Sequence, residues 1–164
     1  MSRGFVKEDD QEEAPMIPPR AALPTGEINY VTPNGLKELK KEEAELTEER
    51  ANLDKENDTE RRRAQAVIDG NLKLLRERIN TARILDPKDQ PGDEVRFGAV
   101  VEFKQNGNTQ KFQIVGVDEA DVKKQKIAFV APIAKAVTGK KVGDKIDFKL
   151  GEETRKLEIL KIAY

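Results

Sequence analysis

Leucine, isoleucine and alanine recur at helical spacing between residues 32 and 86, and this pattern predicts an antiparallel helical hairpin. A period of 3.5 residues keeps the seam between two packed helices closed, and the second arm follows it cleanly. Thr32-Pro33 predicts the start, because threonine can cap a helix and proline loses no hydrogen bond at the first position. The seam residues are Leu36, Leu39, Leu46 and Leu53 in the first arm, and Ile68, Leu72, Leu75, Ile79 and Ala82 in the second.

The turn of this hairpin is predicted at Asn57-Asp58-Thr59, a cluster of turn-forming residues between the arms. Asparagine tolerates the left-handed conformation that ends a helix, and Asp58 or Thr59 can cap the next one. Each arm of about 24 residues would extend roughly 35 Å at 1.5 Å per residue. We therefore expect residues 31–86 to form a coiled-coil finger with a charged tip.

The helical period stops after residue 86, and the pattern changes to short apolar runs and alternation. Residues 87–94, with two prolines and a glycine, are predicted to be a linker. Asn106-Gly107 is a strong signal for a two-residue hairpin turn. Residues 95–164 are predicted to form a small, strongly bent antiparallel sheet with one short helix, which makes the chain an α+β protein. The expected strands are 95–103, 111–117, 126–130, 145–150 and 155–162, and the expected helix is 131–137.

Composition limits what kind of protein this can be. Of 164 residues, 37% are hydrophobic and another 37% are charged, so the chain has room for the finger and one small globular domain. The net charge of −1 predicts no general attraction to DNA or to membranes. The sequence has no cysteine and no histidine, which excludes disulfides, thiolate or imidazole catalysis and the usual zinc and haem ligands. It also has no apolar run long enough for a membrane helix and no hydrophobic signal core, so we expect a soluble cytoplasmic protein.

Residues 1–30 have the composition of a disordered tail. An acidic run over residues 8–13 is followed by four scattered prolines. The alternative is that Arg3, Phe5 and Val6 form a short docking motif for a larger partner.

The tip of the predicted finger gathers carboxylates and arginines within a few residues. The acids could coordinate Mg²⁺, which prefers oxygen ligands. The alternative is that they cap and solubilise the second helix, whose N-terminal dipole favours negative charge. The arginines are candidates for contacts with RNA phosphates, although a short basic run on a helix is usually a solvated face. The acids are Glu56, Asp58 and Glu60, and the arginines are Arg61, Arg62 and Arg63.

Several separated blocks of the sequence resemble the Gre transcription elongation factors. Most of them lie in the C-terminal half and have the order and spacing of that family's C-terminal domain, and one lies at the base of the finger. The resemblance covers about residues 30–164. The blocks are VTPNGL (31–36), RFGAVV (96–101), IVGVDEAD (114–121), APIAKAVTGK (131–140), VGD (142–144) and LEILKI (157–162).

This resemblance implies an FKBP-like C-terminal domain that docks at the rim of the secondary channel of bacterial RNA polymerase. The coiled-coil finger would enter that channel, where two tip carboxylates would share a second Mg²⁺ with the polymerase active site and promote cutting of backtracked RNA. The factor itself would then be an accessory protein and no enzyme. We expect a monomer with no membrane partner, which contacts RNA polymerase and, at its tip, nascent RNA; at the family level DNA binding is also implied. The residues that match the partner-facing segment are Ala131, Pro132, Ile133 and Lys135.

The tip departs from the family's motif, which reads approximately Gly-Asp-Leu-x-Glu-Asn-Ala-x-Tyr. Glu56-Asn57 matches its Glu-Asn pair, but Leu53 stands where the first aspartate should be, and no tyrosine follows. Each arm is also roughly two helical turns shorter than the family's, which loses on the order of 10 Å of reach. Two functions therefore stay open. One is stimulation of RNA cleavage through Glu56, Asp58 or Glu60, with Asp58 and Glu60 as the shared Mg²⁺ ligands; the other is a non-cleaving regulator that occupies the channel.

A more remote alternative is a prolyl isomerase with a coiled-coil adaptor, because the implied domain is FKBP-like. Such a pocket needs clustered aromatic side chains, whereas the aromatic residues here fall in predicted strands, where packing in the core is expected. They are Phe97, Phe103, Phe112, Phe129, Phe148 and Tyr164.

Overall fold

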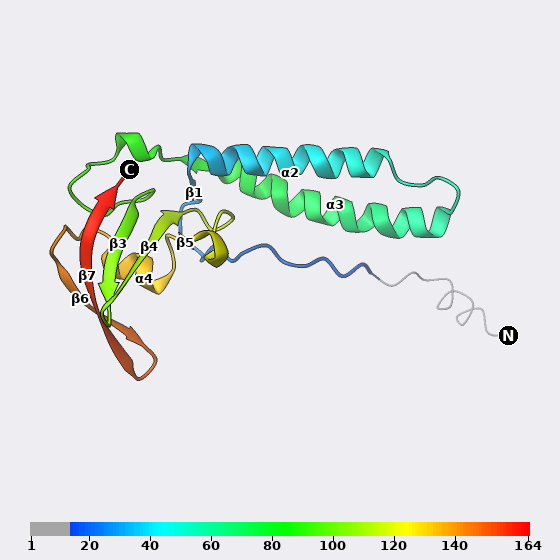
Figure 1. Ribbon diagram of the computed structural model, residues 1–164. Coiled ribbons are helices and arrows are strands. Elements are labelled where there is room, and N and C mark those ends of the chain that lie inside the picture. Colours follow the sequence, from blue (N-terminus) through cyan, green and yellow to red (C-terminus); the bar gives the residue numbers. More distant parts are fainter. Residues whose placement is uncertain (1–13) are drawn as a thin grey trace.

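A computed structural model describes residues 14–164 and shows a two-helix finger that projects from a small curved sheet domain (Figure 1). Helix α2 spans Pro33–Ala51 and helix α3 spans Asp58–Thr81, and the two run antiparallel side by side. At 1.5 Å per residue, their 19 and 24 residues give lengths of about 28 and 36 Å. The predicted hairpin is confirmed.

The two helix starts follow from capping residues. Thr32 accepts a hydrogen bond from the Gly35 backbone N–H at 3.0 Å, and Asn57 accepts one from the Glu60 N–H at 3.2 Å. This corrects the predicted turn at Asn57-Asp58-Thr59: the loop is 52–57, and α3 already begins at Asp58. The reason is that asparagine caps the start of a helix as readily as it ends one.

The seam between the helices is the predicted one. Four of its residues are buried and four are half-buried. Leu53 is half-buried but lies in the loop after α2 rather than on the first arm. The buried seam residues are Leu39, Ile68, Leu72 and Leu75, and the half-buried ones are Leu36, Leu46, Ile79 and Ala82.

A two-stranded parallel ladder closes the base of the finger. Strand β1, Tyr30–Val31, pairs with β2, Arg83–Ile84, so the chain entering the hairpin lies beside the chain leaving it. Val31 is 1% exposed and packs against Leu39 and Leu75. The ladder was not predicted, since two-residue strands carry no detectable alternation.

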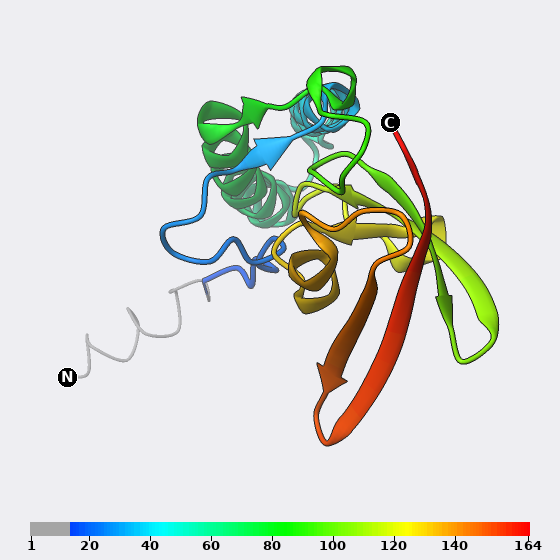
Figure 2. The same ribbon diagram turned by 90° about the vertical axis from the view of Figure 1, so that its left-hand side faces the viewer.

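The globular domain is built on a five-stranded sheet in the order β5-β4-β3-β7-β6 (Figures 1 and 2). Neighbouring strands are antiparallel except β4 and β5, which are parallel and so correct the expected all-antiparallel sheet. Two short 3-10 helices, η1 and η2, lie in the connections. The bounds are η1 Pro87–Asp89, β3 Val100–Gln105, β4 Asn108–Val115, η2 Val122–Lys124, β5 Lys126–Ala128, α4 Pro132–Val137, β6 Lys145–Leu150 and β7 Glu153–Ala163.

Most predicted strands are observed, with one clear difference at the start. The strand expected over 95–103 begins only at Val100, because the chain before it turns at Gly98, whose φ is 88° and whose N–H donates to the Ile114 carbonyl at 2.8 Å. The Asn106-Gly107 turn is confirmed, with φ of 51° and 79°, as a type I′ hairpin requires. Within 87–94, the expected linker contains η1.

One hydrophobic core lies between the sheet and α4. Ala134 and Val137 of α4 are fully buried against it. The positive φ of Gly139, 83°, lets the chain leave the helix immediately afterwards. The other core residues are Val95, Ala99, Val101, Phe103, Phe112, Ile114, Ile146, Leu157 and Ile159.

Residues 14–29 contain no helix or strand and run alongside the finger towards its base (Figure 1). Most of them are exposed, and single residues contact the rest of the molecule. Asn29 is 2% exposed and donates to the Arg78 carbonyl at 2.9 Å. The acidic run 8–13 and the alternative docking motif of Arg3, Phe5 and Val6 lie outside the described residues. Among residues 14–164, no helix is long and apolar enough to cross a membrane.

Candidate functional site

The tip of the finger is an exposed loop held by its own side chains. Asp54 accepts a hydrogen bond from the Glu56 backbone N–H at 2.9 Å, and Asn57 caps α3. Asp58 forms an ion pair with Arg61 at 3.2 Å, one turn along the helix. Local polar contacts of this kind shape the loop and the start of α3, and the capping side chain is Asn57 rather than one of the acids.

The predicted metal candidates Glu56, Asp58 and Glu60 are all exposed. In the part of the chain that the structure describes, no three acidic, histidine or cysteine side chains are gathered closely enough to hold a metal ion. Asp58 and Glu60 therefore do not form a ligand set of their own. The arginine candidates lie on the first turns of α3, where Arg61 is half-buried and Arg62 and Arg63 are exposed.

The predicted docking surface lies around α4. Pro132 is the first residue of the helix and is exposed, whereas Ala131 and Ile133 are half-buried and pack against the core. Lys135 is exposed and reaches Glu27 at 3.6 Å. The segment therefore presents a small apolar surface with a cation at its edge. Val137 packs into the core.

A loop of the globular domain, 116–121, contacts the start of the finger through Glu119. The carboxylate of Glu119 accepts hydrogen bonds from the Thr32 N–H at 3.1 Å, from the Thr32 hydroxyl and from the Gly116 N–H at 3.0 Å. It lies at the N-terminus of α2, where the helix dipole favours a negative charge. A side chain at Gly35 would collide with this carboxylate.

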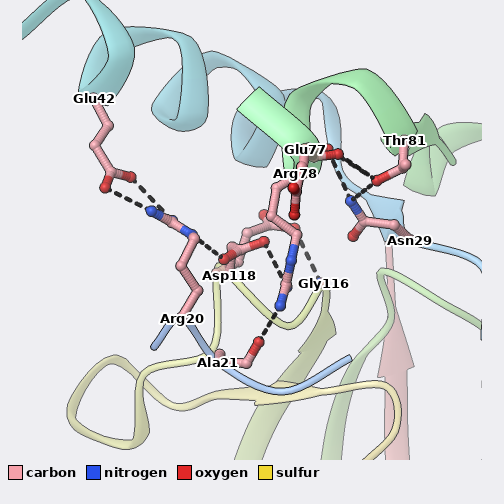
Figure 3. Close-up of polar contacts among 10 residues, drawn as sticks. Arg20, Ala21, Asn29, Glu42, Glu77, Arg78, Thr81, Gly116 and Asp118 are labelled. Carbon is pink, nitrogen blue, oxygen red and sulfur yellow. Dashed lines mark hydrogen bonds and ion pairs between the residues drawn. The ribbon is translucent and has the colours of Figure 1, made fainter. Parts of the chain in front are cut away.

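Asp118, in the same loop, accepts hydrogen bonds from two arginines (Figure 3). Arg20 donates from Nε at 3.0 Å, and Arg78 of α3 donates from Nη1 at 3.1 Å. The Asp118 side chain is only 4% exposed, so both of its oxygens are paired in a nearly dry environment. Arg20 also forms a two-pronged contact with Glu42 of α2, at 2.8 and 3.1 Å. Hydrogen bonding to Glu42 raises the pKa of Arg20, against the lowering effect of burial.

Three aromatic rings meet between the finger base and the domain. Tyr30, Phe97 and Phe129 have ring centroids 5.7–6.0 Å apart, and all three are half-buried. Phe97 and Phe129 lie in turns, which corrects their placement in predicted strands. The cluster joins β1 of the finger base to two loops of the domain. Offset and edge-to-face contacts of this kind add to the area they bury.

The contacts between finger and domain were missed by sequence reasoning. Asp118 and Glu119 fall in a block that carried the family resemblance, but nothing in their local pattern names Thr32 or Arg78 as partners. Arg20 lies in a stretch whose composition is that of a tail. Its partner Asp118 is 98 residues away, so only the fold brings the two together.

Comparison with known proteins gives consistent results. The family described as "Transcription elongation factor, GreA/GreB, C-term" matches residues 90–164. The transcription elongation factor GreA of Acidiphilium cryptum is 38% identical over 105 residues, which are 63% of this chain and 67% of that protein. GreA of Thermodesulfovibrio yellowstonii is 32% identical over 151 residues, covering 82% of this chain and 96% of that protein. Among solved structures, GreA factor homolog 1 of Thermus thermophilus is 22% identical, covering 84% of this chain and all of that one, with a TM-score of 0.40.

Proposed function

Because the chain belongs to the GreA/GreB family of transcription elongation factors, we propose that it binds RNA polymerase at the secondary channel and inserts its finger there. The globular domain would dock at the rim of the channel through Ala131, Pro132, Ile133 and Lys135. The factor would be an accessory protein, and any cutting of RNA would take place in the polymerase active site.

The observation that best supports this proposal is the division of the molecule into a globular domain and a projecting finger (Figure 1). Pro132 and Ile133 offer apolar contact area on a rigid helix, and Lys135 lies at its edge. The finger extends about 28–36 Å from the domain, so a factor bound at the rim would place its tip deep in the polymerase.

For the tip, the geometry favours a regulator that occupies the channel without stimulating cleavage. Asp58 is paired with Arg61, and Asp54 and Asn57 hold the loop through the backbone. The alignment with the Thermodesulfovibrio factor is 151 residues long but includes only 82% of this chain, which is fewer than 151 residues. Part of the relative therefore has no counterpart in this chain. A shortened finger would account for that difference. The alternative is a factor that stimulates cleavage. It would use Asp58 and Glu60 as ligands of a shared Mg²⁺ and Arg61–Arg63 for contacts with RNA.

A binding experiment tests the docking surface. The double substitution Pro132→Asp, Lys135→Glu, at the two exposed positions of this surface, should abolish binding to RNA polymerase, measured by fluorescence anisotropy or native gel shift, while circular dichroism shows a folded protein. The matched control is Leu150→Asp, because Leu150 is 50% exposed and lies at the end of the β6–β7 hairpin. Binding that survives the double substitution would show that the docking surface is elsewhere.

A cleavage experiment separates the two tip functions. A backtracked elongation complex with labelled RNA is incubated with the wild-type protein and with the Asp58→Ala, Glu60→Ala variant. We expect neither to release 3′ RNA fragments, and both to compete with a known channel-binding factor. Release of fragments by the wild type but not by the variant would instead establish cleavage through these carboxylates.

A further inference from the structure

We propose that residues 14–29 act as an intramolecular strap that fixes the angle between the finger and the globular domain, with Arg20 as its anchor. The strap is held by contacts along its length, at Ile17, Arg20, Ala21, Glu27 and Asn29. These contacts reach both helices of the finger, and in the domain they reach the loop 116–121 and Lys135 of α4. The proposal concerns the free protein, so it does not depend on the proposed function.

Arg20 is the residue that ties three parts of the molecule together. Its guanidinium donates to Glu42 of α2 and to Asp118 of the domain, and its side chain is 19% exposed. Arg78 of α3 joins the same cluster by donating to Asp118 and to the carbonyl of Ala21 in the strap (Figure 3). Two arginines therefore alternate with two carboxylates, and Arg20, Arg78 and Asp118 each contact two partners from different parts of the molecule.

The ends of the strap are held by contacts of a different kind. Ile17 packs against α3 where Gly70 has no side chain, and a Cβ at Gly70 would collide with it. At the other end, Asn29 donates to the Arg78 carbonyl and to the Thr81 hydroxyl near the end of α3. The strap thus follows α3 for about three turns, between Gly70 and Thr81.

The geometry explains why a strap is needed. Without it, the finger contacts the domain through the loop 116–121, the aromatic cluster at the base and the single chain crossing after β2. A lever of about 30 Å on such a narrow base can tilt with little change at the junction. Arg20 adds a bridge to Glu42, almost three helical turns along α2 from its N-cap, and so opposes that tilt.

Distance measurements between spin labels test the strap directly. Because the chain has no cysteine, Lys55→Cys at the tip and Glu152→Cys at the β6–β7 turn can be labelled uniquely. Both positions are exposed. In this background, pulsed electron paramagnetic resonance should give one narrow distribution of distances between the two labels. Arg20→Ala should broaden this distribution, or shift it by more than its own width.

Two further variants and one control complete the test. Gly70→Ala should also broaden the distribution, because it displaces Ile17 without touching the charge cluster. Arg20→Lys keeps the charge but not the two-pronged contact, and should fall between the wild type and Arg20→Ala. Arg76→Ala is the matched control, since Arg76 of α3 pairs with Glu43 of α2 at 3.2 Å but lies outside the strap. This substitution should leave the distribution unchanged. A distribution that stays narrow in both Arg20→Ala and Gly70→Ala would overturn the proposal.

Discussion

At the scale of single residues, the junction between the finger and the domain depends on two glycines, which have no side chain, as much as on the side chains that form contacts. The carboxylate of Glu119 accepts three hydrogen bonds in a space left open by Gly35 and Gly116. A Cβ at Gly116 would collide with the Tyr30 carbonyl, and one at Gly35 would collide with Glu119 itself. Close approach of the domain to the finger therefore requires glycine at both positions.

Gly35→Ala should destabilise the protein by about 1–3 kcal/mol, because the displaced Glu119 leaves buried donors unpaired. The loss should appear even though alanine is favoured over glycine in a helix by roughly 0.5–1 kcal/mol. Urea denaturation measures it. Gly92→Ala is the control, since nothing lies within 4 Å of a Cβ there, and it should change stability by less than about 0.5 kcal/mol. Equal stability of the two variants would contradict this account of the junction.

Tyr164 should make the stability of the protein depend on pH. Its hydroxyl donates to the Glu94 carbonyl at 2.6 Å and accepts from the Arg96 N–H at 2.7 Å. Burial raises the pKa of Tyr164, partly offset by the Arg96 hydrogen bond. Stability from the neutral hydroxyl is therefore fully present below the unfolded pKa of about 10, and it is lost as the pH rises through the folded value.

Tyr164→Phe should cost about 0.5–1.5 kcal/mol at pH 7, and this difference from the wild type should shrink above pH 10. Denaturation curves collected at pH 7 and at a series of pH values up to and above 10 measure both effects. A difference that is independent of pH would show that the hydroxyl titrates alike in folded and unfolded chains.

At the scale of elements, the finger was the part most readily predicted. The 3.5-residue period is a local property of the sequence, and the buried residues Leu39, Ile68, Leu72 and Leu75 follow it. The turn was misplaced because Asn57, Asp58 and Thr59 all have turn-forming side chains, and a short polar run does not show which of them caps the helix. In the sheet, the Asn106-Gly107 turn fixed one hairpin, whereas the parallel pairing of β5 with β4 depends on a distant crossing of the chain.

The cap at the tip can be tested by substitution. Asn57→Ala should destabilise α3 by about 0.5–2 kcal/mol, because its side chain accepts the Glu60 N–H. Thr59→Ala, by contrast, should change stability by less than about 0.5 kcal/mol, because Thr59 is an exposed residue within the first turn. Thermal unfolding followed at 222 nm measures both. If Thr59→Ala proved the more damaging, the cap assignment would be wrong.

At the scale of the whole molecule, what could not be predicted is how the finger and the domain are joined. Each half follows from local patterns, but the junction is made by pairs far apart in the sequence, such as Thr32 with Glu119 and Arg78 with Asp118. A charged residue gives no local sign of the partner that it will meet. The candidate docking residues could be named only from the family resemblance. The exposed Pro132 and the half-buried Ile133 are compatible with that role.

The charge cluster should make the two halves of the molecule unfold together. Asp118 is 4% exposed and receives both Arg20 and Arg78, so Asp118→Ala leaves two cations without their shared partner. Removing one member of a buried ion pair typically costs about 3–5 kcal/mol, and this loss falls on the contact between the halves. In a Tyr30→Phe background, where Tyr164 alone reports the domain, we expect one unfolding transition with Asp118 present and two in Asp118→Ala, with the helix signal at 222 nm separating from the fluorescence of Tyr164.

Asp69→Ala provides the matched comparison for this last effect. Asp69 of α3 pairs with Arg50 of α2 at 2.7 Å, but both side chains are more than 40% exposed, and neither touches the domain. Its loss should cost no more than about 1 kcal/mol and leave a single transition. Separate transitions in Asp118→Ala alone would place the coupling in the buried cluster. If both probes stayed coincident in that variant, the aromatic contacts of Tyr30, Phe97 and Phe129 would be sufficient to hold the finger to the domain.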